Sequence, residues 1–236
     1  MLSIFHRELR SCFYTASAYV FMLVFLMLGS VFFAVGNLAS RSGDIGAFLW
    51  NMGYLWMLLT PILTMRTYAA ERQNRTDTLL FSSPVSLRSI VLGKYLAGCA
   101  VLLFTVSLSL IYAVITAVYG RLYIGEALCA YLGFILQGCT FLAIDMFISA
   151  RSRTPATAAV WALGINLLLW LTDAAAEAVS SSVISDLLSR FSPYMRTLPF
   201  RQGQLSPANI CWFLSVIGLM LFLTVRTLDA RRWREG

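Results

Sequence analysis

Long apolar runs separated by short polar stretches dominate the chain. Six runs approach or exceed the length of a membrane span, because about 20 residues rise about 30 Å in a helix, the thickness of the bilayer's hydrocarbon core. Since backbone groups must be paired inside a membrane, this pattern predicts an all-α integral membrane protein with a single transmembrane domain over residues 1–236. We expect spans at Ala16–Gly36, Phe48–Met65, Leu96–Tyr119, Leu128–Ser149, Ala156–Leu171 and Ile210–Val225.

The first thirteen residues, "MLSIFHRELRSCF", have helical amphipathic spacing. Phe5 lies on an apolar face, whereas Arg7 and Arg10 fall elsewhere. This pattern favours an interfacial helix at residues 1–13 that lies in the membrane surface before the first span. A plain basic flank is the alternative.

The polar segment 66–95, between the second and third spans, is more ordered than a simple connector needs to be. Glu71 precedes Arg75 by four positions, the favourable order for an ion pair on one helix. Pro84 ends that helix, and Ser86 can cap a second short helix. We therefore predict a helix, a sharp turn and a helix, which together form a docking surface.

The segment 172–208, before the last span, is moderately apolar and punctuated by prolines. Aliphatic positions from Val179 to Phe191 keep helical spacing, which predicts one or two short external, re-entrant helices. A plain loop is the alternative. At the outer end of the second span, Trp50, Tyr54 and Trp56 are typical of an aromatic belt.

Charge is scarce and unevenly placed. The chain is 59% hydrophobic and 12% charged, about half the charged fraction of a soluble domain, and carries a net charge of +7. Positive residues favour the cytoplasmic side, so we expect both termini in the cytoplasm of a bacterial inner membrane. The basic residues flank spans, so nucleic-acid binding is disfavoured. The residues expected inside are Arg7, Arg10, Arg66, Arg72, Arg75, Arg88, Lys94, Arg151, Arg153, Arg226, Arg231, Arg232 and Arg234.

Polar residues within the spans are candidates for function, because they are costly in hydrocarbon. Asp145 lies six residues before Arg151, so we expect it to reach the inner interface, with a role in translocation as the alternative. Asn166 is in mid-span and can hydrogen-bond between helices. We find no residue pattern for catalysis, a metal or a cofactor. The one "GK", Gly93–Lys94, lacks the rest of a P-loop, so this chain cannot bind ATP in that way.

Four stretches resemble ABC-2-type transporter permeases, closest to the gliding-motility-type (GldF-like) subunits. They are "HRELRSCFYTASAYVF", "ERQNRTDTLLFSSPVSLRSIVLGKYLAG", "FLAIDMFISARSRTPATAA" and "LFLTVRTLDARRW", in the family's order. The resemblance implies a membrane subunit of an ATP-driven exporter. Arg75 stands where the family usually has glycine, and Asp145 where it has a small residue.

The same resemblance implies the partners. A separate ABC ATPase, which holds ATP and Mg, would dock on a cytoplasmic coupling helix. A second permease chain, identical or different, would complete the membrane part, and a large periplasmic subunit could join it. The docking residues implied are Glu71, Arg72, Arg75, Leu79, Pro84 and Arg88.

Three other functions remain open at this point. A haem-export-type permease of cytochrome c maturation has a similar length and a related inner segment. A non-transporting membrane anchor could recruit an ATPase to act on other proteins. An intramembrane enzyme is the third, and it lacks a catalytic set in the sequence.

Overall fold

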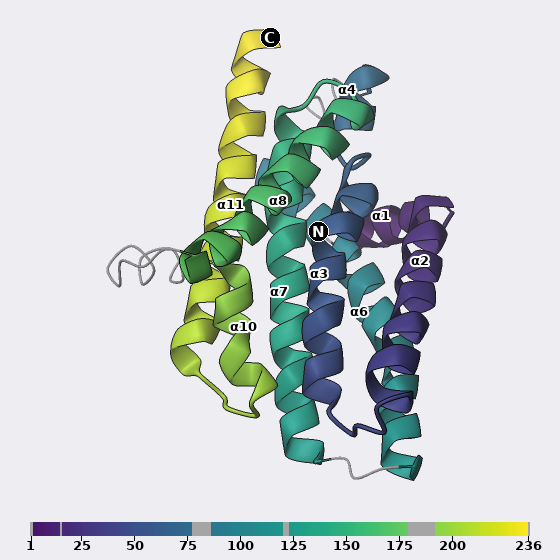
Figure 1. Ribbon diagram of the computed structural model, residues 1–236. Helices are drawn as coiled ribbons and strands as arrows, with labels where there is room; N and C mark the ends of the chain where they lie inside the picture. The colour runs from purple at the N-terminus through teal and green to yellow at the C-terminus, as the bar shows by residue number, and fades with distance from the viewer. Residues whose placement is uncertain (1, 15, 77–85, 120–122, 179–191, 236) are drawn as a thin grey trace.

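The computed structural model describes residues 2–14, 16–76, 86–119, 123–178 and 192–235. These residues form helices joined by turns, and Figure 1 shows the long helices side by side in one bundle. The helices are α1 (Leu2–Tyr14), α2 (Ala16–Phe33), the π-helical turn η1 (Ala34–Leu38), α3 (Ile45–Thr64), α4 (Ala69–Gln73), α6 (Leu87–Tyr119), α7 (Ile124–Arg151), α8 (Pro155–Ala178), α10 (Pro193–Arg201) and α11 (Pro207–Glu235).

Among the described residues, six helices are long and apolar enough to cross a membrane. The all-α fold predicted from the sequence is therefore confirmed. One prediction about these helices is wrong: in the described part of the chain, the residues that follow Ser86 do not form a short helix separate from the third span. Instead α6 runs unbroken from Leu87, capped by Ser86, whose carbonyl accepts from the backbone N–H groups of Ser89 and Ile90. Lys94 lies inside this helix, and the positive charge of the Lys94 side chain is paired with Glu71 within the protein.

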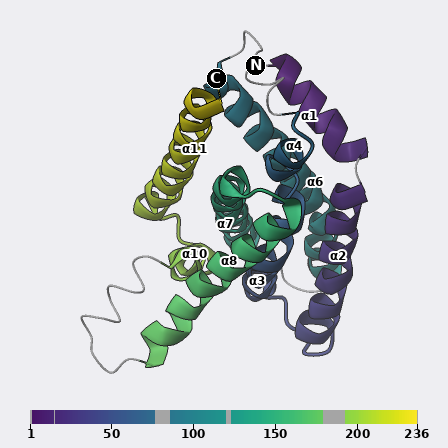
Figure 2. The same ribbon diagram turned by 90° about the horizontal axis from the view of Figure 1, so that it is seen from above.

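Helix α7 lies at the centre of the bundle (Figure 2). An aromatic cluster fills the space between α2, α3 and α7, in which the ring of Trp56 stacks on Phe25 at 4.9 Å and meets Phe134 at 4.8 Å. Trp56 is fully buried and its Nε1 donates to the Phe134 carbonyl at 3.2 Å. Its assignment to an aromatic belt is therefore wrong, because its polar atom finds a partner inside the protein.

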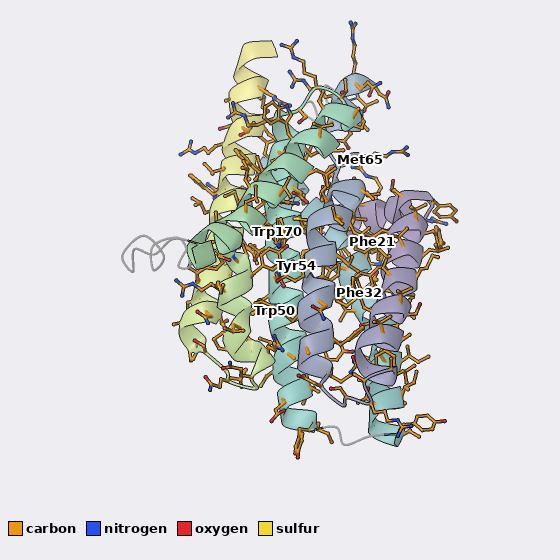
Figure 3. All side chains as sticks on the ribbon, viewed as in Figure 1. Phe21, Phe32, Trp50, Tyr54, Met65 and Trp170 are labelled. Atoms are coloured by element: carbon orange, nitrogen blue, oxygen red, sulfur yellow. The ribbon has the colours of Figure 1, made fainter. Side chains whose placement is uncertain are left out.

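Helices α8 and α10 together cover one side of α7. In Figure 1, α8 leans across the bundle and ends about half-way along α7, and α10 lies beyond that end. Ser192 caps α10 by accepting from Met195 N–H at 3.2 Å. On α3, Tyr54 lies toward this side with Trp50 (Figure 3), and its ring stacks on Tyr194 at 4.9 Å. One short helix is thus present between the fifth and sixth spans, and the predicted positions at 179–191 lie outside the described residues.

The two ends of the bundle carry different helices. The α4 end carries α4, the start of α6, the turn between α7 and α8, and the C-terminal part of α11 (Figures 1 and 2). The opposite end carries η1 and the start of α7. Helix α1 lies across the bundle and packs against α6, as expected for a helix that does not span.

Candidate functional site

The candidate site is the polar segment at the α4 end, between α3 and α6. After α3 ends at Thr64, a turn leads into α4, whose first backbone N–H groups need acceptors. Ser149 of α7 supplies one: its Oγ accepts from Tyr68 N–H at 3.3 Å and from Ala69 N–H at 3.4 Å. A side chain of the central helix therefore fixes the start of α4.

Lys94 of α6 holds the middle of this segment. It is the only lysine in the chain and is 4% exposed. Its Nζ donates to Glu71 Oε1 at 2.5 Å and to the Thr67 carbonyl at 2.9 Å, and it lies 5.2 Å from the centre of the Tyr68 ring. A buried ammonium needs such partners, because an unpaired charge is strongly disfavoured away from water.

Helix α1 joins the same ion pair. Glu8 Oε2 lies 3.6 Å from Lys94 Nζ, and Glu8 Oε1 accepts from Arg7 at 2.8 Å. Two carboxylates, Glu8 and Glu71, therefore share one lysine. Through Lys94, the helices α1, α4 and α6 are held together by charge.

Arg72 connects α4 to the turn between α7 and α8. Its Nη1 donates to the Ser152 carbonyl at 3.2 Å and to the Arg151 carbonyl at 3.4 Å. These carbonyls stand at the C-terminal end of α7, where a positive charge is favoured. The short helix α4 is thus attached to α6 on one side and to α7 on the other.

The residues predicted to dock an ATPase have different places in the structure. Glu71 and Arg72 make the internal contacts above. Arg75 lies beyond the end of α4 with a φ of 55°, so the predicted helical ion pair with Glu71 is wrong. Arg88 lies in the first turn of α6 beside α11, and Leu79 and Pro84 lie outside the described residues. The docking role itself stays a prediction.

The predicted interfacial residues lie along α1. Arg7 has a side chain that is 62% exposed, and the guanidinium of Arg10 lies 5.7 Å from the centre of the Tyr14 ring. Phe5 is half-buried and meets the ring of His6 edge-on at 5.8 Å. The two arginines are therefore exposed, in keeping with an interfacial helix, whereas Glu8 of the same helix turns toward Lys94.

Asp145 and Asn166 meet in the core between α3, α7 and α8. Asp145 is 1% exposed, and its Oδ2 lies 2.6 Å from Thr60 Oγ1 and 3.3 Å from Asn166 Nδ2. Asn166 Nδ2 also donates to the Met57 carbonyl at 3.2 Å. The prediction that Asp145 reaches the interface is wrong, because its side chain points into the bundle, whereas the interhelical hydrogen bond of Asn166 is confirmed.

Two residues that make these polar contacts, Thr60 and Lys94, were not predicted as site residues from the sequence. Thr60 lies one turn before Thr64, a residue of the same type, and has no distinguishing pattern. Lys94 did carry a signal, because it is the single lysine in a chain whose other basic residues are arginines. Among the described residues, no group of three or more His, Cys, Asp or Glu side chains could hold a metal.

Comparison with known families gives one match. A family model described as ABC-2 family transporter protein matches residues 57–196, which is more than half of the chain. The matched region includes α4, Lys94, the Asp145 cluster and the start of α10. A search of curated proteins found no match.

Proposed function

The chain belongs to the ABC-2 family of transporter proteins, and from this we propose that it is the membrane subunit of an ATP-driven exporter. It is a multi-pass membrane protein and a permease component of an ABC transporter. The proposal adds that a separate ATPase, with its ATP and Mg, docks at the α4 end in the cytoplasm. It also adds that two permease chains pair, and that this chain is of the gliding-motility (GldF-like) type.

One observation supports docking at the α4 end more than any other. Helix α4 is short, yet Lys94 attaches it to α6, Ser149 and the Arg72 contacts attach it to α7, and Lys94 connects it further to Glu8 of α1. A displacement of an unattached loop would move only the loop. A displacement of residues beside α4 would instead move α1, α6 and the central helix α7 with it.

The mechanism follows from that attachment. Closure of the ATPase moves α4 as a rigid body, and the helices tied to it shift between two packings by hinge or shear. Energy is transmitted only if the ATPase makes different contacts with the two packings. The internal ion pair of Lys94 would keep α1 and α6 moving with α4.

Arg75 and Arg41 provide a matched test of docking. Both are exposed arginines with positive φ, 55° and 51°, but Arg75 lies at the α4 end and Arg41 at the opposite end. The ATPase is co-expressed with each charge-reversal variant and co-purified. Arg75→Glu should reduce ATPase recovery several-fold, whereas Arg41→Glu should leave it unchanged. Equal recovery with both variants would defeat docking at this end.

Two further measurements extend that test. Arg88→Glu, on the far side of the polar segment, should also reduce recovery, while both variants still insert into membranes. Reconstituted complexes then distinguish an exporter from a membrane anchor. An exporter moves solute or lipid across the vesicle membrane when ATP is added, whereas an anchor binds the ATPase and moves nothing.

A further inference from the structure

A groove between the start of α6 and the C-terminal half of α11 combines basic and apolar residues. Its volume is about 510 Å³, within the range of about 300–1,000 Å³ typical of small-molecule sites. Figure 2 shows the C-terminal end of α11 beside the start of α6. This groove is separate from the contacts of Lys94 and Arg72.

The two kinds of side chain are sorted along the groove. Arg88 at the start of α6, and Arg226, Asp229 and Arg232 near the end of α11, lie toward the α4 end. Leu92 and Phe222, 38% and 53% exposed, line the part nearer the middle of the bundle. The groove is therefore positively charged where the membrane surface is expected and apolar where hydrocarbon is expected.

The charge in the groove is not balanced by the protein. Three guanidinium groups face one carboxylate, and no carboxylate among the described residues is within ion-pair distance of Arg88, Arg226 or Arg232. The Arg226 guanidinium lies 5.2 Å from the centre of the Phe222 ring, so one positive charge stands where the polar and apolar parts of the groove meet. The groove therefore favours an anion.

We infer that this groove binds an anionic phospholipid from the surrounding membrane. The phosphate would be held by the guanidiniums of Arg88, Arg226 and Arg232, which suit phosphate oxygens in bidentate geometry. One acyl chain would lie along Leu92 and Phe222. Basic pockets between membrane helices are known to recognise anionic headgroups in this way.

Other occupants fit less well. A second copy of the chain docked symmetrically here would bring six guanidinium groups together, because the same surface faces itself in a two-fold contact. A soluble phosphate would leave Leu92 and Phe222 unused. The inference does not depend on ATPase docking, since it is tested on the purified chain alone.

The test compares lipid binding by variants that lose the same charge. The purified chain in detergent is titrated with phosphatidylglycerol or with phosphatidylcholine of the same acyl chains, and bound lipid is counted by native mass spectrometry. Arg226→Gln/Arg232→Gln should weaken phosphatidylglycerol binding by about 30-fold, the effect of two surface arginines. The control Arg151→Gln/Arg153→Gln, at the same end but outside the groove, should retain wild-type binding.

Two more variants keep the test decisive if the double variant folds poorly. Arg226→Lys/Arg232→Lys keeps the charge and should keep most binding. Phe222→Ala should weaken binding of phosphatidylglycerol and leave binding of soluble glycerol phosphate unchanged. The inference is overturned if the two lipids bind equally, if the control double variant loses as much as the groove variant, or if glycerol phosphate binds as tightly as the lipid.

Discussion

The ammonium of Lys94 lies 2.5 Å from the Glu71 carboxylate, although 23 positions separate them in the sequence. Only 2% of the Lys94 side chain is exposed and 23% of the Glu71 side chain, so this pair lies largely away from water. It connects the segment proposed to dock an ATPase with the third span. With Glu8 of α1 as the third member, it forms the best-defined charge contact at the α4 end.

Lys94→Met should destabilise the protein, because Glu8 and Glu71 would then face each other with the shared cation removed. Breaking a buried ion pair costs about 3–5 kcal/mol, and partial exposure of Glu71 reduces the expected loss to about 2–3 kcal/mol. Chemical unfolding in micelles measures this loss in the free energy of unfolding. Adding Glu71→Gln should restore part of the loss. Arg10→Met, an exposed charge on α1, is the control and should have little effect.

The single buried lysine also makes a topology test simple. Arg75→Lys and Arg41→Lys each add one exposed amine at opposite ends of the bundle, while Lys94 stays shielded. A membrane-impermeant amine reagent, added to intact cells, should label Arg41→Lys and spare Arg75→Lys. Inside-out vesicles should give the reverse, with labelled peptides identified by mass spectrometry. The opposite pattern would place the α4 end outside the cell and defeat the proposed ATPase docking.

Gly133→Ala should separate α10 from α7. A Cβ at Gly133 would stand 2.6 Å from Phe200 Cβ, and because that atom is fixed to the backbone, no change of rotamer relieves the clash. Overpacking of this kind costs about 1–3 kcal/mol. The control Gly125→Ala, also in α7, meets nothing within 4 Å and should be neutral. The two variants are compared by thermal unfolding, and equal midpoints would show that α10 does not pack as described.

Asp145→Leu should weaken the contacts among α3, α7 and α8, whereas Asp145→Asn should largely preserve them. Asparagine keeps an oxygen that can accept from Thr60, and leucine does not. Interhelical hydrogen bonds in membranes average about 0.6 kcal/mol and reach about 1.7, so the difference should fall in this range. A double-mutant cycle with Thr60→Val isolates the Asp145–Thr60 contact. A coupling energy near zero would contradict the geometry.

The lengths of the apolar runs alone predicted the six spans, because the length of a span is set by the bilayer and not by the protein's own packing. Side-chain partners were harder, since they depend on which helices become neighbours. Trp56 looked like an interface residue until Phe134 supplied an acceptor from α7. Asp145 looked close to the surface by its distance from Arg151, but the rotation of α7 turns it inward.

The polar segment shows the same limit at shorter range. Glu71 and Arg75 have the spacing of a helical pair, and sequence alone cannot show that α4 stops at Gln73. The actual partner of Glu71 comes from another helix. The resemblance to a permease family nevertheless identified the segment in which these contacts occur.

The early end of α8 has a consequence for the surrounding lipid. On this side the bundle is completed by α10, and Arg196 of α10 donates to Asn209 near the start of α11 at 3.0 Å. The polar side chains of Arg196 and Asn209 therefore lie at a level of the bundle where a longer α8 would present apolar side chains. We therefore expect acyl chains beside α10 and α11 to shorten or tilt around these groups, which would thin the bilayer locally. Such a thinner patch would lower the barrier for headgroups to cross at this flank of the protein.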